Sequence, residues 1–232
     1  MSLLILLACA DPPITADDVA PLAPASKKVT FATVEELGSH RLDATIDRTN
    51  LVPDQDPVTT KEVIAVRWQD PDHWQARRSR DGAPIDQIVV WDHTAWEAVG
   101  KGPLVKRGDA EPYRVQLAST WDPWKAALES AAERLTLTAT VLEDVDGRRA
   151  WRHAVSFLPL GENVHANWRV TAADGEVWID ERTAVRLVGK VNVASQGKDR
   201  SREVLLQFAV SRIGQDVGVV DPTADDALTP PP

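Results

Sequence analysis

Apolar and polar residues alternate with a period of two over most of the chain between residues 29 and 215. This alternation is typical of β-strands that bury one face and expose the other, and it recurs in about eleven runs. Asp-Gly pairs, which favour tight hairpin turns, separate runs at residues 81–82, 146–147 and 174–175. The sequence therefore predicts a mainly β protein whose antiparallel strands are joined mostly by hairpins.

One segment has helical periodicity. Asp122 followed by Pro123 is typical of a helix start, and the apolar residues behind them predict an amphipathic helix over residues 123–134. Thr33 and Glu36 fit a capping box, which predicts a second, shorter helix. A single sheet of about eleven strands cannot stay flat, so it must curl or split. We expect one curled antiparallel sheet, an incomplete β-barrel, with one or two helices covering its apolar concave face.

The composition excludes several classes of function. Acidic residues outnumber Lys and Arg by 35 to 26, which argues against a nucleic-acid partner, because such proteins neutralise phosphates. The single cysteine excludes an internal disulfide framework and a cysteine-rich metal site. The sequence contains no common hydrolase, zinc-protease, dinucleotide-binding or P-loop motif. We therefore expect no enzyme, no cofactor and no metal site, and leave open a hydrolytic pair formed by residues distant in sequence.

Two histidine patterns have alternative interpretations. Asp92-His93-Thr94 could belong to a catalytic set, but its place between two strand runs favours a tight turn. His153 and His165 could face each other across a hairpin and hold a metal. No third ligand has a usable spacing, so we expect partly buried structural histidines instead.

Basic residues cluster at 77–80, 148–152 and 198–202. If the turns near residues 147, 175 and 197 share one rim of the sheet, the last two clusters meet there. Such a rim could contact anionic lipid headgroups. Acidic residues would lie on the same rim, so we expect a mixed, solvated edge.

The N-terminal segment resembles the lipobox of bacterial lipoproteins. An apolar run over residues 3–7 is followed by Ala8 and Cys9, and in a lipobox this cysteine becomes the lipidated first residue. The alternative is a simple apolar tail with a buried thiol. Residues 1–9 are thus expected to be a signal and lipobox segment, followed by a Pro-, Ala- and Asp-rich tether (10–28), a folded domain (29–215) and a disordered tail (216–232).

The stretch Gly175-Glu176-Val177-Trp178-Ile179-Asp180, continuing through Thr183 to Leu187, extends this resemblance. Together with the lipobox-like start and a strand meander interrupted by a helix, it resembles the LolA/LolB and LppX/LprG lipoprotein-carrier superfamily. The resemblance spans about residues 29–214 and depends on architecture. It implies a curled, incomplete β-barrel whose concave apolar face, covered by helices, accepts acyl chains or other apolar ligands. It transfers no functional site residue by residue.

We therefore expect a lipoprotein anchored through Cys9 in the bacterial cell envelope, facing the periplasm, with the outer membrane as its expected address. It would bind or carry a lipid or acyl-chain ligand; the alternative is a sensor or scaffold with a filled core that binds an envelope protein. Nine of the 13 aromatic residues are Trp, which suits a large apolar surface or a cavity. The residues expected to line the cavity are Val66, Trp68, Val89, Trp91, Val155, Phe157, Trp168, Leu187, Leu206 and Phe208, with Trp124 and Leu128 as contacts of the covering helix.

Overall fold

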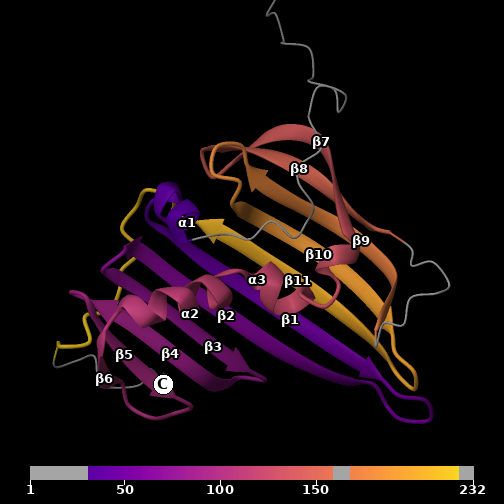
Figure 1. Cartoon of the computed structure of the whole chain (residues 1–232), viewed down its shortest axis with the longest axis horizontal. Coiled ribbons are helices and arrows are strands. Elements are labelled where there is room, and N and C mark those ends of the chain that lie inside the picture. Colours follow the sequence, from indigo (N-terminus) through magenta and orange to yellow (C-terminus); the bar gives the residue numbers. More distant parts are fainter. Residues whose placement is uncertain (1–30, 159–167, 225–232) are drawn as a thin grey trace, which may run out of the picture.

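The computed structural model describes residues 31–158 and 168–224, without the side chains of residues 31, 32, 118–121 and 133. Cys9, the tether, His165 and the end of the tail lie outside the described residues. Eleven strands form one antiparallel sheet in the order β6-β5-β4-β3-β2-β1-β11-β10-β9-β8-β7 (Figure 1). The strands are β1 (His40–Leu51), β2 (Val58–Asp70), β3 (His73–Arg80), β4 (Ala83–Trp91), β5 (Thr94–Val99), β6 (Val105–Asp109), β7 (Leu135–Val145), β8 (Arg148–Phe157), β9 (Arg169–Asp180), β10 (Arg186–Gln196) and β11 (Ser201–Ser211).

The sheet curls but does not close, because β6 and β7 stay unpaired on their outer sides. Its concave face carries the helices α2 (Glu111–Trp121) and α3 (Pro123–Leu128), while α1 (Phe31–Leu37) precedes β1 (Figure 1). The predicted fold class, a mainly β protein with one curled open sheet and helices on its concave face, is confirmed.

The helical segment differs from the prediction in its length. Asp122 does start a helix: its carboxylate accepts hydrogen bonds from the backbone N–H groups of Trp124 and Lys125. However, α3 ends at Leu128, and only a short 3-10 helix (Ala132–Arg134) follows before β7. The helix α2 was not predicted, because residues 111–121 lack a clear apolar stripe.

Local turn chemistry explains three of the hairpins. The residues of Asp81-Gly82, Asp146-Gly147 and Asp92-His93 all have positive φ angles, the conformation of tight hairpin turns. The first two predicted Asp-Gly turns and the turn at Asp92-His93 are therefore confirmed. The turn predicted at Asp174-Gly175 is wrong, because both residues lie inside β9.

Gly175 serves a close approach between strands instead. Its φ angle is +131°, and a Cβ atom there would lie 2.2 Å from the carbonyl oxygen of Lys190 on β10. The chain turns back only after β9, over residues 181–184. As a result, the β7–β8 and β10–β11 turns lie at opposite ends of the strands. The basic clusters 148–152 and 198–202 therefore do not lie on the same rim of the sheet.

The core lies on the concave face. Alternate residues of the central strands, such as Leu42 and Ile46 on β1 and Leu206 on β11, are fully buried there with Trp68 and Trp74. The folded part also extends past the predicted boundary at residue 215. Val217 is buried, its backbone N–H contacts Gln69 on β2, and Arg67 donates to the Gly218 carbonyl.

Candidate functional site

The helix α3 covers the concave face above β1 and β11 (Figure 1). Trp124 and Leu128, the two residues expected on the covering helix, point into the core and are 2% and 1% exposed. Together these two side chains shield the centre of the concave face from solvent.

Seven of the ten residues predicted to line a cavity belong to the core on this face: Val66, Trp68, Val155, Phe157, Leu187, Leu206 and Phe208. Val89 and Trp91 do not. On β4 the core residues are Ile88 and Val90, so Val89 and Trp91 point to the opposite, convex face. Both faces of this strand are apolar, so alternation alone could not decide which one is inside.

Two arginines attach α3 to the sheet. Arg186 Nη1 lies 3.6 Å from Asp122 Oδ2, and its guanidinium lies 5.0 Å from the centroid of the Trp124 indole. Arg48 donates through Nη1 to Glu62 and through Nη2 to the carbonyl oxygen of Ala126 on α3, both at 2.9 Å. The layer between helix and sheet thus combines apolar packing with charged contacts.

Arg186 is the more deeply buried of the two arginines, at 7% exposure. Burial lowers the pKa of its guanidinium, and the nearby Asp122 carboxylate partly opposes this effect. A buried ion pair stabilises a contact less than well-packed apolar groups of the same size would. The attachment of α3 is therefore weaker than a fully apolar one.

Side chains of the described residues fill most of the space under α3. A hollow of about 20 Å³ remains, room for about one water molecule. Its walls are Ala127, Leu128, Ser130, Ala131, Trp168, Val193, Ser195, Arg202 and Val204. An acyl chain does not fit into this hollow, so a chain bound at this point would require α3 to move.

Two buried indoles carry unused donors. The Nε1 atoms of Trp74 and Trp124 have no hydrogen-bond partner within the part of the chain that the structure describes. An unsatisfied buried N–H costs about 1–3 kcal/mol. Each of these groups could therefore donate to an oxygen, such as an ester carbonyl, brought into the core by a ligand.

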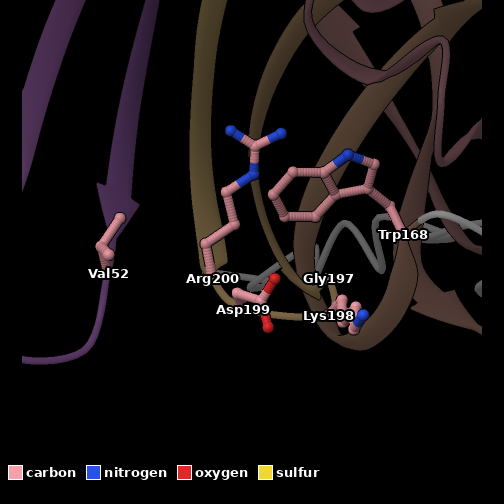
Figure 2. Close-up of a pocket in the computed structure, with 6 residues that line it drawn as sticks. All are labelled: Val52, Trp168, Gly197, Lys198, Asp199 and Arg200. Carbon is pink, nitrogen blue, oxygen red and sulfur yellow. The ribbon is translucent and has the colours of Figure 1, made fainter.

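The hollow lies near the surface at the end of the strands where the β10–β11 turn is found. Trp168 lines both the hollow and an open pocket of about 540 Å³ (Figure 2). The guanidiniums of Arg202 and Arg200 lie 4.5 and 5.2 Å from the centroid of its indole. Lys198 and Asp199 complete this side of the pocket, and Val52 faces them. We call Trp168, Lys198, Arg200 and Arg202 the basic mouth; the alternation predicted Trp168 but not the arginines around it.

Other site types are not seen in the described residues. They hold no group of three or more His, Cys, Asp or Glu side chains placed to bind a metal ion. Among the same residues, no helix has both the length and the apolar character needed to cross a bilayer.

No protein-family model matches the chain, and neither does any curated protein. One match among solved structures is a LolA superfamily protein from Nitrosomonas europaea, with 7% identity and a TM-score of 0.24, covering 87% of this chain and 98% of that one. Another is the lipoprotein LppX from Mycobacterium tuberculosis, with 13% identity and a TM-score of 0.30, covering 82% of this chain and 97% of that one. A third is a DUF1329 family protein from Desulfovibrio piger, with 8% identity and a TM-score of 0.29, covering 86% of this chain and 97% of that one. The group that the sequence resembles is thus among the matches. With such low identities and TM-scores they assign neither a site nor a ligand, so the case for any ligand has to come from this chain's own residues.

Proposed function

We propose that this protein is a lipoprotein of the bacterial envelope that binds or carries a lipid or acyl-chain ligand between the concave face of its sheet and α3. The observation that supports this best is the attachment of α3. A short helix covers a largely apolar sheet face, yet it is fastened through the buried charge of Arg186. No bond is made or broken in this function.

Burial of an acyl chain can compensate for the apolar contacts that are lost when α3 lifts from the sheet. Lifting α3 exposes Trp124 and Leu128, at a cost of about 1.5–3 kcal/mol each. A 14-carbon acyl chain gains about 0.8 kcal/mol per CH₂ on burial, or about 10 kcal/mol gross. This gross gain exceeds the cost of exposing the two side chains, and the surplus offsets part of the cost of association and of ordering the acyl chain. The unused indole N–H groups of Trp74 and Trp124 would help to orient ester oxygens.

A lipid anchor at Cys9 fits this function. With the tether of residues 10–28 it would hold the domain close to a membrane that supplies or receives the ligand. The Cys9→Ser variant should then move from the membrane to the soluble part of the envelope fraction. Unchanged membrane partitioning of that variant would count against lipidation.

Native mass spectrometry tests the ligand. Protein purified gently from a bacterial host should carry a mass increment that disappears after delipidation and is identified as a lipid by fragmentation. The delipidated protein should then bind a pyrene-labelled fatty alcohol in a 1:1 complex. Protein that is empty as isolated and does not bind the fatty alcohol would overturn the proposal.

The filled concave face supports a second candidate, a sensor or scaffold that binds an envelope protein. Its docking surface would be the convex face, where a groove of about 470 Å³ is lined by Trp178, Val188 and Leu205, among others. Leu205→Asp on this face should abolish capture of the partner and leave binding of the fatty alcohol unchanged. Unchanged capture of the partner by this variant would count against the convex face as the docking surface.

A further inference from the structure

We propose that the basic mouth holds the anionic headgroup, a phosphate or a carboxylate, of an amphiphile whose chain lies under α3. This inference depends on the proposed function and adds a headgroup class to it. Lys198 and Arg200 line the open pocket with Trp168, Arg202 lies against the same indole, and Asp199 is the carboxylate beside them.

These cations differ from most other arginines of the protein in their pairing. Arg48, Arg148 and Arg186, for example, each contact a carboxylate. Within residues 31–158 and 168–224, no acidic side chain lies within ion-pair distance of Lys198, Arg200 or Arg202. The basic mouth therefore keeps its positive charge available for a ligand.

The two arginines are already positioned for such a ligand. Both guanidiniums lie against the indole of Trp168, whose electron-rich face attracts them. Arg202 is also held by a hydrogen bond from Nε to Asn50 Oδ1 of 3.1 Å, which leaves its terminal nitrogens for another acceptor. Guanidiniums bind phosphate or carboxylate through paired N–H groups, and an anion between them would relieve their mutual repulsion.

The basic mouth adjoins the hollow under α3. Trp168 and Arg202 line the hollow together with Leu128, and Trp168 also lines the open pocket. A ligand with its chain in place of Leu128 would thus emerge beside both arginines. A ligand with one anionic group at the end of its chain would place the chain against the apolar side chains and the anion beside the arginines.

The test uses the whole delipidated protein and displacement of the uncharged pyrene-labelled fatty alcohol. The competitors are lysophosphatidylglycerol and lysophosphatidylcholine with the same acyl chain. The anionic lipid should bind about 10-fold more tightly at low ionic strength, as expected for charge-assisted hydrogen bonds. Added salt should reduce this preference, because the pocket is open to solvent.

The double variant Arg200→Gln/Arg202→Gln should lose the preference and keep its affinity for lysophosphatidylcholine. A matched control, Arg77→Gln/Lys101→Gln, removes the same charge from two exposed positions elsewhere and should keep the preference. Circular dichroism shows whether each variant is folded. Direct displacement by glycerol phosphate measures what the headgroup contributes without a chain.

The outcomes separate this inference from the proposed function. Equal affinity for the two lysolipids, with tight binding of both, overturns the anionic headgroup site and leaves the carrier function standing. Glycerol phosphate binding as tightly as lysophosphatidylglycerol overturns the amphiphile in favour of a site for free anions. Failure of both lysolipids and of the fatty alcohol to bind overturns the proposed function and the headgroup site with it.

Discussion

The guanidinium of Arg186 on β10 lies against the indole of Trp124 on α3, 5.0 Å from the ring centroid, and its Nη1 is 3.6 Å from Asp122 Oδ2. A charge from the sheet is thus buried beneath the helix that covers it. This contact is one of the two through which arginines hold α3 on the sheet, and it can be altered without removing the helix cap. Asp122 still accepts hydrogen bonds from the backbone of Trp124 and Lys125 when Arg186 is replaced.

We predict that the double variant Arg186→Met/Asp122→Asn leaves the free energy of unfolding unchanged or raises it by about 1 kcal/mol, because both buried charges are removed together and Asn still caps α3. Tighter docking of α3 should slow the uptake of a lipid probe. Urea unfolding and stopped-flow fluorescence measure the two effects. Loss of more than about 2 kcal/mol, with uptake no slower, would mean that this ion pair is needed for folding and does not control α3.

Neighbouring leucines on β11 test which face is the core. Leu206 is fully buried on the concave face, while Leu205 lines the convex groove. Leu206→Ala should destabilise the protein by about 2–5 kcal/mol, through lost burial and a new cavity. Leu205→Ala, the matched control, should cost less than about 1.5 kcal/mol. Similar losses at the two positions in urea unfolding would contradict the assignment of the faces.

His40 gives the protein a defined pH dependence. Burial lowers its pKa to about 4, while the hydrogen bond between Nδ1 and the Gly38 carbonyl opposes this effect. In the unfolded chain the imidazole has a pKa of about 6.5, so between these values the unfolded state binds more protons. Stability is therefore expected to fall as the pH drops from about 6.5 to about 4, by up to about 1.4 kcal/mol per pH unit.

The His40→Gln variant should flatten this dependence. Urea midpoints at several pH values between 7 and 4 provide the measurement. His93→Gln, which changes an exposed histidine in the β4–β5 turn, serves as the control and should keep the wild-type slope. An unchanged slope in His40→Gln would show that another group causes the acid sensitivity.

Gly175 should tolerate substitution worse than a turn glycine. Gly175→Ala places a Cβ atom 2.2 Å from the Lys190 carbonyl oxygen in a conformation essentially restricted to glycine, and should cost at least about 3 kcal/mol. Gly82→Ala in the β3–β4 turn meets no atom within 4 Å and should cost about 1 kcal/mol. Equal thermal stability of the two variants would contradict the strand geometry around Gly175.

The two kinds of Asp-Gly pair show how far sequence analysis extends. At Asp81-Gly82 the pair and its flanking residues suffice to form a turn, so the prediction was correct. At Asp174-Gly175 the same pair lies within a strand, because the glycine accommodates a backbone on β10. Contacts between distant residues, which local patterns do not encode, decided that case.

The candidate site follows the same division. Alternation and the Asp122-Pro123 signal predicted Trp124, Leu128 and most of the apolar wall. The basic cluster 198–202 was noted as a possible contact for anionic headgroups, but its place beside Trp168 was not predicted, and neither was Arg48. These positions depend on strand order: Arg202 meets Trp168 only across β9, β10 and β11, and Arg48 meets α3 only across the curled sheet. The prediction that Val89 and Trp91 line the cavity was wrong for a different reason. A strand that is apolar on both faces does not indicate which face lies inside.

The pairing of β1 with β11 also shapes how the chain can be made. Each half of the sheet is a meander of neighbouring strands, but the seam that joins the halves runs from Arg41 with Ser211 to Leu51 with Ser201. The two halves of the sheet therefore stay unpaired with each other until β11, the last strand, has been synthesised. A polypeptide of this topology therefore completes its architecture only at the end of its synthesis.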